Sequence, residues 1–164
     1  MGGVTRRLAV LRHAKSDWSR PEPDVERPLA ARGRRDATAA GGWLRAELPD
    51  IDLVLCSPAV RARQTWQRAA AGLPDPPPVR IEPRIYAATA DALLAVARDL
   101  PPSATTVVLV GHHPGLADLV ALLTGTELVL KTCAVAVPEF TGGWPDLGPG
   151  RATLRVTAKI RGTG

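Results

Sequence analysis

The chain has 164 residues, 45% of them hydrophobic, which suits one soluble globular domain over 1–164, and its longest apolar runs are too short to span a bilayer or to form a signal peptide. Its formal net charge of +5 comes mainly from scattered arginines, without the clustered basic and aromatic side chains that stack bases. These features exclude a membrane-spanning protein, argue against nucleic-acid binding and predict a cytoplasmic location.

The first predicted element is a buried strand over 7–12. A loop rich in proline and charged residues follows over 16–28, and its length is typical of the wall of a functional site. Small and charged residues then predict a helix over 31–48, weakened by two adjacent glycines and ended by Pro49.

A second strand is predicted over 52–56, directly before a helix start. Ser57 suits the N-cap of that helix and Pro58 suits its first position, because proline lacks the N–H that a first turn leaves unpaired. The helix is expected to reach about residue 71, before a run of prolines. We interpret Ser57 as structural, since no Gly-x-Ser-x-Gly turn or partner base marks it as a nucleophile.

The second half of the chain continues this alternation of short apolar runs and helix-like stretches. We expect a strand over 79–81, a helix over 89–100 that is capped by Thr89, and a buried strand over 106–110 that is broken by Gly111. A helix over 114–123 that begins at Pro114 and two closing strands over 133–137 and 153–159 follow. The alternation predicts an α/β protein: a three-layer α/β/α sandwich with a mixed, mostly parallel sheet.

The two cysteines, Cys56 and Cys133, lie far apart in the sequence and inside apolar, strand-like segments. We expect two buried free thiols in a reducing compartment, not a disulfide. Their spacing builds no metal site.

All three histidines directly follow a predicted buried strand, His13 after the first and His112 and His113 after the strand over 106–110. In open α/β sheets, ligands bind outside the carboxyl ends of the strands. If these two strands are neighbours, the histidines face one crevice together with Arg12 and Arg61.

Two histidines and two arginines suit a phosphoryl group. Guanidinium groups bind its non-bridging oxygens, and an imidazole can act as a nucleophile or a hydrogen-bond donor. The helix that begins near Ser57 would direct its amide groups at the same anion. No carboxylate cluster suggests a magnesium site, so no metal and no cofactor are expected.

Three segments, 11–14, 57–65 and 111–115, resemble in order the three motifs of the histidine phosphatase superfamily, whose fold is phosphoglycerate mutase-like. The first motif is Arg-His-Gly in most of the family, and Ala14 replaces its glycine here. The segment 12–18, with Arg27-Pro28-Leu29 and Gly33, is similar to the short SixA-type branch, which removes phosphate from phosphohistidine.

The resemblance implies a metal-independent phosphatase with a covalent phosphohistidine intermediate. His13 would be phosphorylated, Arg12 and Arg61 would bind the phosphoryl group, and His112 would donate a hydrogen bond to it in the transition state. The expected partner is a protein that carries phosphohistidine or, on the same scaffold, a small phosphate ester.

The general acid is not evident from the sequence. Other branches of the family place Asp directly after the second catalytic histidine, where this chain has His113, or use a Glu from a middle loop. Glu82 and Asp17 are candidates. Absence of a strong acid favours phosphohistidine, because a protonated imidazole leaves phosphorus readily.

Three functions therefore remain open from the sequence: a protein phosphohistidine phosphatase, a small-molecule phosphomonoesterase, and an idle module that binds phosphorylated ligands. The intact set of His13, Arg12, Arg61 and His112 argues against the third. The oligomeric state has no signal in the sequence.

Overall fold

A computed structural model describes residues 3–163, with six strands in one sheet of order β3-β2-β4-β1-β5-β6. The strands are β1 (Thr5–Arg12), β2 (Leu53–Cys56), β3 (Val79–Ile81), β4 (Thr106–Gly111), β5 (Ala134–Thr141) and β6 (Thr153–Lys159). The helices are α1 (Ala31–Glu47), α2 (Val60–Ala70), α3 (Ala90–Arg98) and α4 (Gly115–Thr124), with short 3-10 turns η1 (Asp24–Glu26), η2 (Pro83–Ile85) and η3 (Trp144–Asp146).

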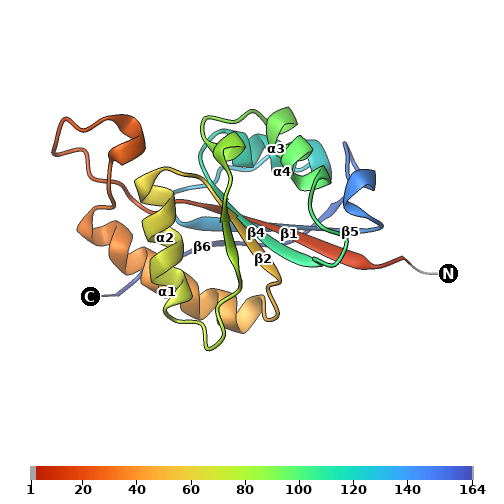
Figure 1. Cartoon of the computed structure of the whole chain (residues 1–164), viewed down its shortest axis with the longest axis horizontal. Coiled ribbons are helices and arrows are strands. Elements are labelled where there is room, and N and C mark those ends of the chain that lie inside the picture. Colours follow the sequence, from red (N-terminus) through yellow and green to blue (C-terminus); the bar gives the residue numbers. More distant parts are fainter. Residues whose placement is uncertain (1–2, 164) are drawn as a thin grey trace.

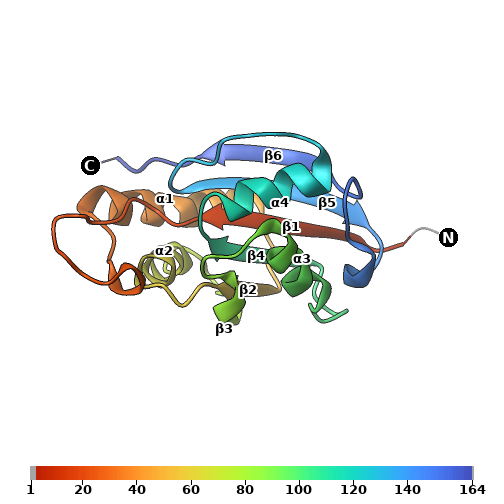
Figure 2. The same cartoon turned by 90° about the horizontal axis from the view of Figure 1, so that it is seen from above.

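The sheet is mixed, as the sequence predicts. Strands β3, β2, β4 and β1 are parallel, whereas β5 and β6 run antiparallel to their neighbours. Figure 1 shows α3 and α4 above the strands and α1 and α2 below them, and Figure 2 shows the same arrangement from above. The three-layer α/β/α fold is confirmed.

Alternation along β1 divides the buried side chains between the two faces of the sheet. Leu8 and Val10 pack with residues of α3 and α4, whereas Ala9 and Leu11 pack with residues of α1 and α2. Successive side chains of a strand point to opposite faces, so the buried segment Leu8–Leu11 of β1 serves both cores. β1 is thereby held at the centre, and its carboxyl end has a fixed position.

Helices α1 and α2 approach each other closely at Gly41. A Cβ atom added at Gly41 would lie 2.3 Å from the carbonyl oxygen of Ala69 on α2, whereas one added at the neighbouring Gly42 would meet nothing within 4 Å. From the sequence, both glycines are expected to destabilise the helix. The structure shows that Gly41 permits the helix contact and that Gly42 has no such role.

Several helices and strands begin or end at residues other than those predicted. Helix α2 begins at Val60, with Ala59 as its N-cap, so Ser57 and Pro58 lie outside the helix. Strand β5 continues to Thr141 because a register shift at Val137/Pro138 accommodates the proline. Gly111 does not break β4 but is its last residue.

Both cysteines are buried and free, as predicted. Among the described residues, 3–163, no helix has the length and apolar character needed to cross a membrane.

Candidate active site

The pairing of β1 with β4 brings the first two histidines together. The register places Arg12 opposite Gly111, and the backbone N–H of His13 donates to the carbonyl of Gly111 at 3.0 Å. The ring centroids of His13 and His112 lie 5.3 Å apart. The sequence predicts that these histidines meet if their strands are neighbours. β1 and β4 are neighbours, and the two rings do lie together.

The ring of His13 is oriented by the backbone beside it. Its Nδ1 lies 2.8 Å from the carbonyl oxygen of Ala14, and a carbonyl can only accept, so Nδ1 carries the proton. The neutral ring then has its lone pair on Nε2. Thr65 stabilises this segment by accepting a hydrogen bond from the N–H of Ala14 at 3.0 Å and donating to the carbonyl of Arg61 at 2.7 Å.

Both paired histidines are neutral near pH 7. Burial is the main cause that lowers the pKa of His13 to about 3, and the nearby charges of Arg61 and Arg12 lower it further. Burial and Arg61 likewise lower the pKa of His112 to about 4. A neutral imidazole keeps the lone pair that a nucleophile requires.

Arg61 lies in the first turn of α2 and is buried, with its guanidinium between the two rings. Its Nε lies 3.4 Å from Nε2 of His13, and its Nη2 lies 3.3 Å from Nδ1 of His112. One edge of the guanidinium thus faces both histidines. This edge can bind two oxygens of one phosphoryl group.

Ser57 contacts the ring of His112, a contact that the sequence does not predict. Its backbone N–H donates to the carbonyl of Val110 at 3.0 Å, which continues the pairing of β2 with β4 by one residue. Nε2 of His112 lies 2.7 Å from Ser57 Oγ, and because Nδ1 accepts from Arg61, Nε2 carries the proton and donates. Ser57 therefore orients His112. Its Oγ also accepts from the N–H of Ala59 at 3.2 Å, which stabilises the turn before α2.

Arg12 completes the predicted set at the end of β1. Its Nη1 donates to the carbonyl of Leu130 at 2.8 Å, which fixes one side of the guanidinium. Its Nε is buried and has no hydrogen-bond partner among residues 3–163. An unpaired buried donor is costly, and an anion bound beside His13 would offer it an acceptor.

A carboxylate from the long loop also reaches this group. Asp24 of η1 accepts from Nη2 of Arg61 at 3.1 Å, from Nη1 of Arg27 at 2.7 Å, and from the hydroxyl of Tyr86. The hydrogen bond from Tyr86 is the main cause that holds the pKa of Asp24 well below its usual range, and Arg27 and Arg61 lower it further. Asp24 is therefore ionised near pH 7. The Tyr86 ring lies edge-on to His112, at a centroid distance of 5.5 Å. Sequence reasoning missed Asp24 and Tyr86, although Asp24 lies just before the Arg27-Pro28-Leu29 segment.

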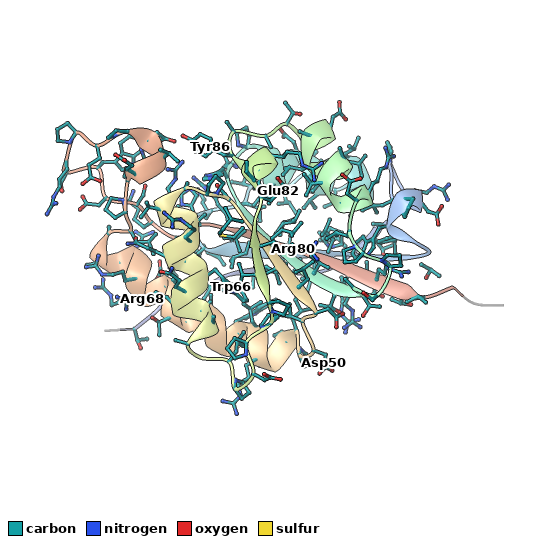
Figure 3. The ribbon with its side chains drawn as sticks, viewed as in Figure 1. Asp50, Trp66, Arg68, Arg80, Glu82 and Tyr86 are labelled. Atoms are coloured by element: carbon teal, nitrogen blue, oxygen red, sulfur yellow. The ribbon has the colours of Figure 1, made fainter. Side chains whose placement is uncertain are left out.

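The two carboxylates considered as general acids are engaged elsewhere. Glu82 accepts from the backbone N–H of Arg84 at 2.9 Å and from its side chain at 2.8 Å, and Asp17 accepts from the N–H of Ser19 at 2.8 Å. Figure 3 shows Glu82 and Tyr86 in the upper part of the molecule, with Asp50 at the opposite end. Neither Glu82 nor Asp17 lines the cavity beside His13.

That cavity has a volume of about 220 Å³ and is lined almost entirely by polar and basic side chains. Its lining residues are Arg12, His13, Lys15, Ser16, Trp18, Arg27, Arg61, His112, His113 and Thr132. Three arginines, one lysine and no carboxylate in this lining make it suited to an anion. A larger hollow of about 440 Å³ lies at the opposite edge of the sheet, next to Asp50 and Asp75, and holds none of the histidines.

No three His, Cys, Asp or Glu side chains within residues 3–163 are grouped as metal ligands.

Known proteins resemble this chain in sequence and in fold. Residues 8–86 match the model of the histidine phosphatase superfamily (branch 1). The uncharacterized protein Rv1276c of Mycobacterium tuberculosis is 40% identical over 155 residues, which cover 88% of this chain and 96% of that protein.

Two solved structures extend the similarity over nearly the whole chain. The putative phosphohistidine phosphatase SixA of Nakamurella multipartitia superimposes with a TM-score of 0.84 at 33% identity, covering 98% of this chain and 99% of that one. The putative phosphohistidine phosphatase SixA of Agrobacterium tumefaciens gives a TM-score of 0.81 at 25% identity, over 94% and 97% of the two chains.

Proposed function

Because this chain belongs to the histidine phosphatase superfamily and is a phosphatase of the SixA-like branch, we propose that it removes the phosphoryl group from phosphohistidine in proteins, through a phosphorylated His13. The observation that carries this proposal is the fixed orientation of His13. Its Nδ1–H donates to Ala14, and its Nε2 faces Arg61 in a cavity lined by basic side chains.

In the first step, the lone pair on Nε2 of His13 attacks phosphorus. A new N–P bond forms while the bond between phosphorus and the leaving imidazole breaks, and that imidazole leaves with its own proton. The Arg61 edge and the free donors of Arg12 bind the equatorial oxygens. Charge stabilisation by fixed donors is the main contribution to phosphoryl transfer.

His112 supports this step through its second nitrogen. With Nε2–H held by Ser57, only Nδ1 faces the guanidinium of Arg61 and the position of the phosphoryl group. A bound dianion raises the pKa of a neighbouring imidazole, because it stabilises the charged form. His112 then becomes able to donate from Nδ1 to a phosphoryl oxygen.

In the second step, water attacks phosphorus of the phosphorylated His13, and the N–P bond breaks. Inorganic phosphate is released, and His13 returns to the neutral form with Nδ1 bonded to Ala14. The donors that bind the phosphoryl oxygens in the first step bind them again in the second.

The absence of a carboxylic acid in the cavity lining supports a nitrogen leaving group. An alkoxide needs a proton donor to leave, whereas the imidazole of phosphohistidine brings a proton with it. The rim of the cavity also exposes Trp18, which is 70% accessible to solvent, and stacks it on Arg27 at 3.6 Å from the ring centroid. An exposed aromatic side chain at a rim suits contact with another protein.

The experiment compares phosphate release from a phosphohistidine-bearing carrier protein and from small phosphomonoesters, with a chelator present throughout. Wild type should prefer the carrier, and His13→Ala should release no phosphate from either substrate. A His13-dependent preference for small esters would replace the substrate class and keep the mechanism. Wild-type activity in His13→Ala would overturn the nucleophile, and activity lost to the chelator would overturn metal independence.

An idle binding module makes a different prediction in a quench experiment. The enzyme predicts that acid-labile, base-stable phosphate is trapped on wild type and is missing from His13→Ala. A module that only binds phosphorylated ligands would trap none on either protein.

A further inference from the structure

We propose that Asp24 is a positioning residue, which holds the guanidinium of Arg61 so that its Nε–Nη2 edge faces the two histidines. The inference rests on the proposed phosphoryl transfer at His13 and extends it to a residue of the long loop. It explains why a carboxylate lies beside a site built for an anion.

The contacts of Arg61 divide between two edges of its guanidinium. The outer edge belongs to Asp24: Nη1 donates to its backbone carbonyl at 2.6 Å, and Nη2 donates to its carboxylate at 3.1 Å. The inner edge faces His13 through Nε at 3.4 Å and His112 through Nη2 at 3.3 Å. Nη2 has two N–H groups, so one serves each edge.

This division allows Asp24 and a phosphoryl group to bind Arg61 at the same time. The planar guanidinium directs its donors outward along separate edges, and only the inner one points to the space beside His13. Asp24 therefore does not have to leave during turnover. A carboxylate that only blocked the site would occupy the inner edge.

Asp24 is itself held by residues outside α2. Oδ1 accepts from Arg27, whose Nε is anchored on Ser16 Oγ at 3.1 Å, and Oδ2 accepts from the hydroxyl of Tyr86. Arg27 is buried. These two donors, one on each carboxylate oxygen, restrict the rotation of the Asp24 side chain, and the restriction passes to Arg61. Orientation of this kind lowers the barrier of the chemical step more than it improves ground-state binding.

The test is a double-mutant cycle on turnover of para-nitrophenyl phosphate, with Asp24→Ala, Arg61→Ala and the double variant. Asp24→Ala should lower kcat about tenfold or more while KM stays level or falls, because removal of a negative charge favours the anionic substrate. In the Arg61→Ala background, Asp24→Ala should change kcat by less than about twofold, because its effect acts through Arg61.

Glu26→Gln is the matched control, since Glu26 is an exposed carboxylate of the same turn, η1, and makes no side-chain hydrogen bond or salt bridge in the described chain. It should leave kcat and KM unchanged. Asp24→Asn, which keeps the size and one acceptor, serves if Asp24→Ala lowers the melting temperature. Unchanged kcat in Asp24→Ala, or an equal loss with and without Arg61, would overturn the positioning role.

A second readout does not depend on turnover. The Nε–H of Arg61, assigned by its loss in Arg61→Lys, should give a sharp ¹H–¹⁵N signal in the wild type and in Glu26→Gln. It should broaden or move toward the free-arginine position in Asp24→Ala. If the substrate assignment were wrong, this signal would still respond to Asp24. If the signal did not respond to Asp24→Ala, the proposal that Asp24 positions Arg61 would be wrong, whatever the substrate.

Discussion

Nε of Arg61 lies 3.4 Å from Nε2 of His13, across the ring from the Nδ1 that is bonded to Ala14. The backbone thus fixes one ring nitrogen, and the other faces a cation. This arrangement disfavours a protonated ring and keeps the Nε2 lone pair directed into the cavity. It also means that Arg61 affects both the binding of an anion and the state of the nucleophile.

Arg61→Ala should therefore reduce kcat/KM by about 100-fold to 1000-fold, with a lower kcat and a higher KM, because the substitution removes a buried donor to the anion. Steady-state kinetics on para-nitrophenyl phosphate measure this. Arg63→Ala is the control, since Arg63 is an exposed arginine of the same helix and donates to Pro58 at 3.1 Å. Equal losses in the two variants would show that helix charge, and not the placement of Arg61, matters.

The pH profile should reflect the depressed pKa of His13. Its ordinary pKa is 6.5, at which only about 3% of the ring would be neutral at pH 5. Burial lowers the folded pKa to about 3, so the nucleophile stays neutral as pH falls from 7 to 5 and is lost only near pH 3. Between pH 7 and 5, kcat/KM corrected for ionisation of the substrate should change less than about threefold. A decline of about 25-fold between pH 7 and 5, with a midpoint near 6.5, would contradict the buried neutral ring.

Ser57→Ala should slow turnover about threefold to tenfold and leave phosphoenzyme formation on His13 detectable. The variant removes the acceptor that orients Nε2–H of His112, at 2.7 Å, and one such hydrogen bond stabilises by about 0.5 to 1.5 kcal/mol. Rapid-quench trapping of the phosphoenzyme is the measurement. If Ser57→Ala abolished the phosphoenzyme, Ser57 and not His13 would be the better candidate for the nucleophile.

The two adjacent glycines of α1 should respond oppositely to alanine. Gly41→Ala places Cβ 2.3 Å from the carbonyl of Ala69 and should lower the free energy of unfolding by about 1 to 3 kcal/mol. Gly42→Ala meets nothing within 4 Å and should raise it by about 0.5 to 1 kcal/mol, since alanine favours a helix interior. Urea denaturation of both variants measures the difference. Similar changes in both would contradict the close contact of α1 with α2.

The sequence predicts the layered fold and the meeting of Arg12, His13, Arg61 and His112 because both depend on strands with strong apolar patterns. Once β1 and β4 are neighbours, the residues that follow them must lie together. The roles assigned to these four residues stay predictions.

The contacts made by the long loop could not be predicted in the same way. Asp24 reaches Arg61 through one short turn, and Tyr86 reaches Asp24 from a second one, η2, so no periodic pattern relates them. The predicted N-cap role of Ser57 is wrong for a related reason. Its spacing fits an N-cap, but α2 begins three residues later, and its hydroxyl contacts a histidine 55 positions away.

The spacing of His13 and His112 depends on peptide groups of two paired strands, because the N–H of His13 donates to Gly111 and the chain continues from there into His112. On this backbone, Ser57 orients the ring of His112, and Arg61 lies between the two rings. Over evolutionary time, the parts of the loop over 16–28 that do not hold Asp24 can change in length or charge and so admit different phosphorylated molecules, while the paired strands keep the backbone positions of the two histidines. Families built in this way can diversify their substrates without rebuilding their chemistry.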